Sequence, residues 1–246
     1  MEPTKSIIEV SKLNKSFGEN HVLRDFDMSL AAGENLVILG KSGSGKSVLI
    51  KCIIKLIEAD SGEIMVLDHD ISALDQDEMD LLRKDIGFLF QSNALYDSMT
   101  IRENLEFPLR RHWTVEQRES QAEDAVMEAL EDVGLSHTVN MMPSELSGGM
   151  RKRIALARTL ILKPKVILYD EPTTGLDPIT AREISELMIS IQEKYKASSV
   201  IISHDMNCIR ITSNRVITLI EGRNYMADTY ENLMKNTDPK VSEFFR

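Results

Sequence analysis

Long apolar runs, cysteine and net positive charge are all scarce in this sequence. No stretch of its 246 residues approaches the roughly 18 to 20 consecutive apolar residues that a membrane-spanning helix needs. The opening segment, MEPTKSIIEV, also lacks the apolar core of a secretory signal. We therefore expect the chain to stay in the cytosol, so any role at a membrane requires a separate partner subunit.

The shortage of positive charge argues against a general nucleic-acid binder, and the shortage of cysteine argues against a disulfide or a cysteine metal site. The chain has 29 Lys and Arg against 39 Asp and Glu, a net charge of −10. A general nucleic-acid binder would need a basic surface to displace counterions, although this sum leaves room for a local basic patch. Cys52 and Cys208 lie far apart with no partner ligands nearby. We interpret them as small buried side chains rather than as a disulfide or a metal site.

The spacing of apolar residues predicts alternating strands and helices. The runs SIIEVSKL and HVLRDFDMSL, separated by the turn-prone residues 17–20, predict a pair of antiparallel strands. Further short buried strands are expected at 35–39, 64–67, 86–90, 166–169 and 199–202. Helices are expected at 47–57, at 116–133 with Gly134 as its stop, and at 179–196.

This order of elements predicts a single α/β domain over residues 1–246. Strands and helices alternate over 1–91 and again over 164–225, which we expect to form a catalytic core with a mostly parallel sheet and N-terminal antiparallel strands. Residues 92–163 have a helical pattern and are expected to form an inserted helical subdomain. The C-terminal tail, 226–246, supports no functional interpretation.

The first motif that indicates a chemical function is a glycine-rich loop at residues 40–47. It matches G-x-x-x-x-G-K-[ST] between a buried strand and a helix, the context in which this pattern binds nucleoside triphosphates. Loop N–H groups and the positive end of the following helix then point at phosphate oxygens. Lys46 is expected to contact the β- and γ-phosphates and Ser47 to ligate Mg²⁺. The loop consists of Gly40, Lys41, Ser42, Gly43, Ser44, Gly45, Lys46 and Ser47.

Two carboxylates, Asp170 and Glu171, follow the apolar strand 166–169. The carboxyl end of this strand is expected to share a sheet edge with the glycine-rich loop. We therefore expect Asp170 to hold Mg²⁺ through water, and Glu171 to polarise an attacking water as a general base. A solvated acidic turn is the common explanation for a lone Asp-Glu pair, and the upstream loop is what favours the functional interpretation.

The segment LSGGM at 146–150, followed by the basic run RKRIALARTL, resembles the signature LSGGQ of ATP-binding cassette (ABC) ATPases. As plain structure it is a serine cap, two glycines and a helix start, a second anion-binding arrangement. The resemblance implies that Ser147, Gly148 and Gly149 face the ATP held by the glycine-rich loop of a second subunit. A head-to-tail pair of ATPase subunits, expected to be a homodimer, then completes each site.

Other residues match the ABC pattern in the same order along the chain. Phe17 matches the aromatic that stacks on adenine, although tyrosine is more usual there and a core aromatic at a strand end is an open alternative. Gln91 matches the glutamine that senses Mg²⁺ and the attacking water and joins the core to the helical subdomain. Asp177 matches the D-loop residue that communicates across the dimer, and without the resemblance it is only a helix cap. His204 matches the switch histidine that contacts the γ-phosphate.

The resemblance extends over about residues 6–225, with two departures. Met150 replaces the usual glutamine that ends the signature, and Tyr169 places an aromatic directly before the acidic pair. LSGGM, the segment QSNALYDSMTIRENLEFPLR and the ending DPKVSEFFR are similar to the ATPases of phospholipid transporters that work with MCE proteins (the Mla and Mkl type). The segment at 92–110 also fits the generic surface by which such an ATPase contacts a permease.

The family implies a function and a location. The chain is expected to bind and hydrolyse ATP with Mg²⁺ and to drive integral membrane permease subunits from the cytoplasmic face of the inner membrane. An MCE-domain protein would be a further partner, and no nucleic acid is expected. The alternatives are the ATPase of an importer for polar solutes and a soluble ABC ATPase outside transport. A P-loop kinase for small molecules would leave the signature and the switch histidine unexplained.

Overall fold

The strands of the computed structural model, which describes residues 6–245, form two sheets. The antiparallel sheet has the order β2 (Asn20–Ala31), β1 (Ser6–Phe17), β4 (Ser61–Val66) and β5 (His69–Asp70). The second sheet has the order β10 (Arg223–Asp228), β9 (Arg215–Ile220), β3 (Asn35–Leu39), β8 (Ser198–Ile202), β7 (Val166–Asp170) and β6 (Ile86–Leu89). It is parallel from β9 to β6, with β10 as an antiparallel edge. The expected fold class, a mostly parallel α/β core with N-terminal antiparallel strands, is confirmed.

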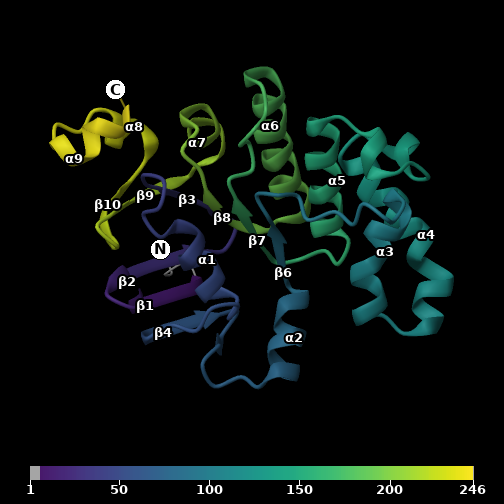
Figure 1. Ribbon diagram of the computed structural model, residues 1–246, viewed down its shortest axis with the longest axis horizontal. Coiled ribbons are helices and arrows are strands. Elements are labelled where there is room, and N and C mark those ends of the chain that lie inside the picture. Colours follow the sequence, from purple (N-terminus) through teal and green to yellow (C-terminus); the bar gives the residue numbers. More distant parts are fainter. Residues whose placement is uncertain (1–5, 246) are drawn as a thin grey trace.

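Helices cover the parallel sheet and continue into a separate block beside it (Figure 1). Many begin at a side-chain cap: Thr100, Thr114, Ser147 and Asp177 each accept a hydrogen bond from a backbone N–H in the first turn. The helices are α1 (Lys46–Ile53), α2 (Gln76–Lys84), α3 (Ile101–His112), α4 (Val115–Asp132), α5 (Gly148–Leu160), α6 (Pro178–Tyr195), α7 (Met206–Thr212), α8 (Tyr230–Met234) and α9 (Pro239–Ser242).

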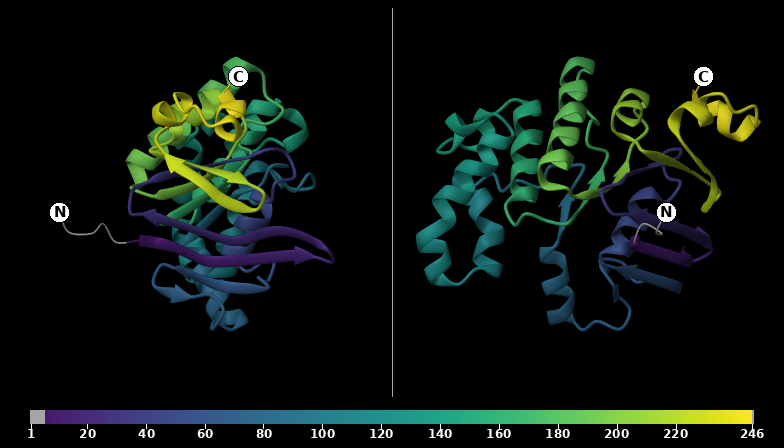
Figure 2. Two further views of the ribbon diagram at one scale, coloured as in Figure 1. Left: turned by 90° about the vertical axis from the view of Figure 1, so that its left-hand side faces the viewer. Right: turned by 180° about the vertical axis from the view of Figure 1, so that it is seen from behind.

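The parallel sheet has an apolar cluster on each face because successive side chains of a strand point to opposite sides. Leu36 and Ile38 of β3 pack with α1 and the antiparallel sheet, whereas Val37 and Leu39 pack on the other face with α5 and α6. All residues of β3, β7 and β8 are buried, as expected for parallel strands covered on both sides. The helix α1 is therefore enclosed between the two sheets (Figure 2).

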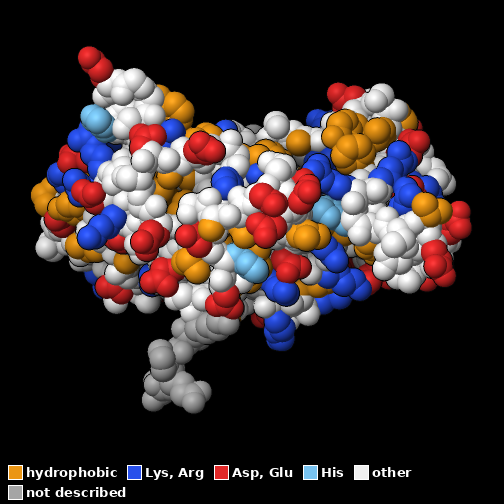
Figure 3. All heavy atoms as spheres, turned by 90° about the horizontal axis from the view of Figure 1, so that it is seen from below, with side chains coloured by type: hydrophobic (Ala, Val, Ile, Leu, Met, Phe, Trp, Pro, Cys, Tyr) orange, Lys and Arg blue, Asp and Glu red, His pale blue; other side chains and the backbone are white. Residues whose placement is uncertain are grey.

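The helices α3, α4 and α5 share a third apolar cluster, which contains Leu105, Val126 and Ile154. They lie at the end of the molecule opposite to the C-terminal helices α8 and α9 (Figures 1 and 2). Among residues 6–245, none of the helices combines the length and the apolar content that crossing a bilayer requires. Acidic, basic and apolar side chains are interspersed over the face shown in Figure 3.

Most expected elements are present, but the helix expected over 47–57 is wrong in its extent. It ends at Ile53, and Lys55 takes a left-handed conformation with φ +52°. The carbonyls of Ile54 and Lys55 accept hydrogen bonds from Arg83 of α2 instead of continuing the helix. Periodicity overestimated this helix because Ile54 and Ile57 belong to a turn that packs in the same core. The interpretation of both cysteines as buried free thiols is confirmed.

Asn104 joins α3 to the segment that leads into it. Its buried side chain accepts a hydrogen bond from the N–H of Tyr96 and donates to the carbonyls of Tyr96, Met99 and Thr100. We expect Asn104→Leu to lower the free energy of unfolding by about 3 kcal/mol, because it leaves buried backbone groups unpaired. Urea unfolding followed by circular dichroism measures this loss. Arg110→Gln on the same helix, where the side chain is about half exposed, is the control and should change stability little.

Candidate active site

A cavity of about 720 Å³ lies at the carboxyl edge of the parallel sheet. Four parts of the chain meet there: the end of β1 with the start of β2, the loop after β3 with the start of α1, the segments that follow β6, β7 and β8, and Glu243 with Phe244 of the C-terminal tail. The lining consists of Phe17, Val22, Leu39, Gly40, Lys41, Ser42, Gly43, Gly45, Lys46, Ser47, Val48, Gln91, Glu171, His204, Met206, Glu243 and Phe244.

The glycine-rich loop wraps around its own lysine. Gly45, with φ +104°, is the cap of α1, and a Cβ added there would come within 2.7 Å of Val22. The buried ammonium of Lys46 donates to the carbonyls of Gly40 (2.7 Å) and Lys41 (3.0 Å). Burial lowers the pKa of Lys46, while the charge of Glu171 opposes that shift. A desolvated cation and the N-terminus of α1 therefore face the same cavity, an arrangement suited to a polyphosphate.

Ser47 and Asp170 form a pair of oxygen donors beside the loop. The Ser47 hydroxyl donates to Asp170 Oδ1 at 2.9 Å. Burial raises the pKa of Asp170, and the hydrogen bond from Ser47 works against that rise. Within the described residues, no group of three His, Cys, Asp or Glu side chains is arranged to hold a metal. A hydroxyl and one carboxylate nevertheless fit Mg²⁺, which commonly completes its octahedron with substrate phosphates and water.

Glu171 lies at the centre of the charged groups. Its Oε1 is 3.8 Å from the Lys46 ammonium, and its Oε2 is 2.7 Å from His204 Nδ1. Thr174 Oγ1 also donates to Oε2, at 3.2 Å. The backbone of Glu171 has φ +52°, a conformation that side chains other than glycine adopt at a cost. The N–H of Glu171 donates to Ile202 of β8, which holds the residue in this conformation.

Phe17 and Gln91 enter the cavity from two different sheets. Phe17 ends β1 and is 50% exposed, so it is not the core aromatic that the sequence left as an alternative. The ammonium of Lys15 lies 5.3 Å from the centre of its ring. Gln91 follows β6, and its backbone carbonyl accepts a hydrogen bond from Lys152 of α5. Both residues line the cavity.

The signature residues and Asp177 are not brought into this cavity. Ser147 caps α5 by accepting a hydrogen bond from the N–H of Met150, while Gly149 lets the helix approach Thr180 closely, since a Cβ there would lie 2.6 Å from the threonine methyl. Asp177 caps α6 through the N–H groups of Ile179 and Thr180. The N-terminus of α5 is left facing outward, with Ser147 and Gly148 exposed.

The two departures from the ABC pattern have packing explanations. Met150 packs against the apolar cluster of α3, α4 and α5, where a methionine contributes apolar contacts that a glutamine would not. Tyr169 is fully buried in the cluster shared with α5 and α6, so it is a core side chain rather than a site residue. Neither residue lines the cavity.

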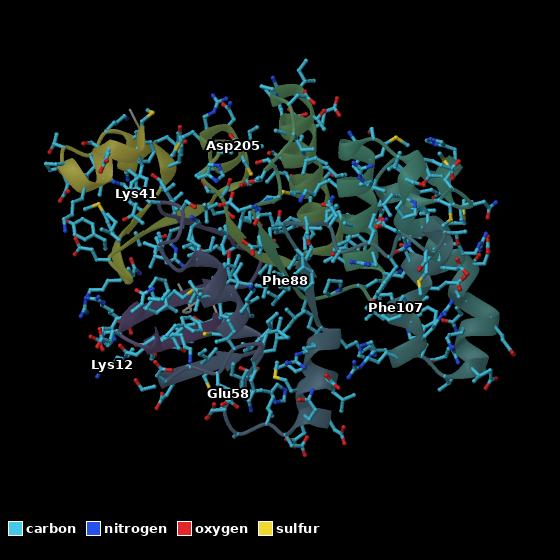
Figure 4. The ribbon with its side chains drawn as sticks, viewed as in Figure 1. Lys12, Lys41, Glu58, Phe88, Phe107 and Asp205 are labelled. Atoms are coloured by element: carbon cyan, nitrogen blue, oxygen red, sulfur yellow. The ribbon has the colours of Figure 1, made fainter. Side chains whose placement is uncertain are left out.

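The tail residues Glu243 and Phe244 are cavity-lining groups that sequence reasoning missed. Leu233 and Val241 are fully buried and fix the tail against the core. The carboxylate of Glu243 then pairs with the Lys41 ammonium at 2.9 Å, and Figure 4 shows Lys41 beside the C-terminal helices. No local pattern marks this contact, because 202 residues separate the two side chains.

Comparison with known proteins agrees with this geometry. Residues 23–174 match the ABC transporter family. The chain is 39% identical over 98% of its length to a probable ribonucleotide transport ATP-binding protein, mkl, of Mycobacterium leprae, and spans 69% of that protein. It is 38% identical over 88% of its length to the glutamate/glutamine/aspartate/asparagine transport ATP-binding protein BztD of Rhodobacter capsulatus, spanning 81% of it.

A solved structure gives the same fold. The dimeric ATP-binding cassette MJ0796, bound to ADP and Pi, superposes with a TM-score of 0.82 at 31% identity, over 91% of this chain and 98% of that one. The chain spans about two thirds of the mkl relatives that it matches, 66% in the Mycobacterium tuberculosis proteins.

The raised pKa of Asp170 predicts that removing its charge stabilises the nucleotide-free protein but abolishes turnover. Because its ionised form is less favourable in the folded chain than in the unfolded chain, this carboxylate reduces stability at neutral pH, and the penalty disappears as the pH falls through its pKa. Asp170→Asn should therefore raise the melting temperature of the nucleotide-free protein, by about 2–4 °C per kcal/mol gained. It should also remove Mg²⁺-dependent ATP hydrolysis. A lower melting temperature at pH 7 would contradict this account.

Proposed function

Because this chain belongs to the ABC transporter family and is a transporter ATPase, we propose that it works as a dimer beneath a membrane permease and powers phospholipid movement with an MCE-domain protein. The permease places the chain at the cytoplasmic face of the inner membrane. In this proposal the glycine-rich loop and the signature of opposite subunits enclose each ATP.

One observation supports a mechanism that needs two subunits: the glycine-rich loop and the signature of one chain do not line the same cavity. Lys46, Ser47 and Glu171 share a cavity, whereas the N-terminus of α5 at Ser147 is exposed and does not line it. A helix N-terminus with free N–H groups attracts anions. A second copy, placed head to tail, would supply that N-terminus to the open side of the cavity and exclude bulk water from it.

The roles of the cavity residues follow from their positions. Glu171 accepts the proton of the attacking water. His204, whose Nδ1 lies 2.7 Å from the carboxylate, fixes the direction of that carboxylate and contacts the γ-phosphate. Lys46 exchanges its loop carbonyls for phosphate oxygens and stabilises the charge that develops on them. Ser47, Asp170 and Gln91 are the residues that would hold Mg²⁺, which when bound neutralises phosphate charge. Phe17 provides a face for adenine, and Asp177 communicates across the dimer.

The surface proposed for the permease lies on the segment after Gln91. Tyr96 and Phe107 are both about 40% exposed, and their ring centres are 4.8 Å apart. They form an apolar patch at the helical end of the molecule, where Figure 4 places Phe107. Aromatic pairs of this kind are suited to anchoring a partner helix. Because Gln91 borders both this segment and the cavity, movement of the permease and of the nucleotide site are linked through it.

Phospholipid as the cargo is supported by the sequence of the same segment and of LSGGM, which are similar to ATPases that work with MCE proteins. An importer of polar solutes is the second candidate, because two similar proteins are named as ATP-binding proteins of ribonucleotide transport and of amino-acid transport. The ATPase does not touch the cargo, so its site chemistry is the same in both cases. A soluble ABC ATPase outside transport is the weaker alternative.

We expect Glu171→Gln to keep ATP binding, to trap a closed dimer and to lower turnover by at least about a hundredfold, because the amide cannot accept the proton from water. Steady-state hydrolysis and size-exclusion chromatography with ATP measure the two effects. A variant that hydrolyses ATP at the wild-type rate would show that Glu171 is not the base.

Crosslinking between subunits tests the proposed head-to-tail dimer directly. Cysteines substituted for Ser44 and Ser147 should crosslink between chains when ATP is present in the assembled complex. The native Cys52 and Cys208 are buried, so they provide no competing reactive thiol. The single substitutions are the controls. Failure of the crosslink to form between chains would rule out the head-to-tail dimer.

The transport proposal predicts that the chain co-purifies with an integral permease and that phospholipid, rather than polar solutes, stimulates hydrolysis by the complex. Phe107→Gln should reduce this co-purification because it removes half of the aromatic patch. Met65→Gln, at a similarly exposed position on β4, is the matched control and should leave it unchanged. Stimulation by a polar solute would favour the importer, and a soluble complex on DNA or ribosomes would contradict transport.

A further inference from the structure

Lys152 is a buried cation that the proposed chemistry does not use. It lies in α5, four residues after the exposed signature glycine Gly148, and is 2% exposed. Its ammonium donates a hydrogen bond to the backbone carbonyl of Gln91 at 3.1 Å. The contact therefore joins the helix that carries the signature to the residue at which the β6 strand enters the nucleotide cavity.

Burial of this ammonium costs free energy unless polar groups compensate its charge. Desolvation lowers the pKa of Lys152, and the carboxylate of Asp170 acts in the opposite direction. The neighbouring buried positions of α5, Ile154, Ala155 and Leu156, are apolar. An apolar side chain at position 152 would fill the same space without that cost, so packing alone does not explain a lysine here.

The path of the chain after β6 gives the contact its significance. Asn93 and Ala94 both have positive φ, +63° and +53°, so the segment turns sharply just beyond Gln91. Arg158 of α5 donates to the carbonyls of these two residues, at 3.1 and 2.7 Å. Arg158 thus holds the turn, whereas Lys152, nearer to the signature, holds Gln91 itself.

We propose that Lys152 is a positioning residue that fixes Gln91 in the nucleotide cavity and makes its position depend on the signature helix. Any displacement of the N-terminus of α5 moves the Lys152 ammonium, and with it the carbonyl of Gln91. The signature of one subunit is then linked to the Gln91 of the same subunit. This inference rests on the role of Gln91 in the proposed function.

A double-mutant cycle between Lys152→Met and Gln91→Ala tests the linkage in the full chain. Methionine keeps the length and volume of the side chain but removes the donors and the charge. Each single variant should lower kcat roughly tenfold or more, as displacement of a positioning group does. If Lys152 acts through Gln91, the double variant loses no more activity than Gln91→Ala alone. A fluorescent ATP analogue should bind all three variants with about the wild-type Kd.

Two further variants separate positioning from folding. Lys165→Met removes an exposed lysine paired with Asp85 and should leave kcat and the melting temperature near wild type. Lys152→Gln keeps a donor without the charge, and it replaces Lys152→Met in the same cycle if the methionine variant does not fold. Retention of more activity by glutamine than by methionine supports the hydrogen bond as the working contact.

The possible failures are distinguishable. Wild-type kcat for Lys152→Met, or losses that multiply in the double variant, would overturn the positioning role of Lys152 while Gln91→Ala remains impaired. If Gln91→Ala hydrolyses ATP normally, both this inference and the role of Gln91 in the proposed function are wrong. A weakened nucleotide Kd with unchanged kcat would assign Lys152 to binding and overturn the inference.

Discussion

The charges at the carboxyl edge of the parallel sheet are the constraint on which the rest of this structure depends. Lys46, Asp170 and Glu171 are all largely buried, and none of them would be placed there by packing alone. The attraction of Lys46 for the two carboxylates and the carbonyls of the glycine-rich loop compensate only part of the lost hydration. Asp170 and Glu171 repel each other, and the pKa of Asp170 is raised. Stability is therefore given up locally at the point where a triphosphate and its cation would supply the missing charges.

The apolar clusters on the two faces of the parallel sheet offset the energetic cost of burying these charges. Fully buried strands such as β3 and β7 hold their carboxyl ends in fixed register, with Leu36 to Leu39 packed on both faces. Because α1 is enclosed between two sheets, Lys46 and Ser47 at its start have little freedom to move. The helix α5 joins the sheet to the helical block, because Ala155 and Leu156 pack on the sheet while Ile154 on its other face packs with α3 and α4.

Much of the site could be predicted from the sequence, because its motifs have fixed spacing and lie next to readable strands. The glycine-rich loop, Asp170 and Glu171 were predicted from motifs beside strands, whereas Gln91 and His204 were assigned through the resemblance to ABC ATPases. The α/β fold class and the ABC family are confirmed. The extent of α1 was wrong, since its end is set by Arg83 from a helix 29 residues away. The contacts of Lys152 and Glu243 could not be predicted either, because their partners, Gln91 and Lys41, are distant in sequence.

The position of the tail has a practical consequence for handling the protein. Val241 anchors the last turns against the core, and the chain emerges next to Lys41 at the mouth of the nucleotide cavity. A bulky group attached to the side chain of residue 243 would lie beside the glycine-rich loop and obstruct access to the cavity. The same proximity is useful for spectroscopy: an environment-sensitive dye attached near Phe244 would report on occupancy of the cavity in real time.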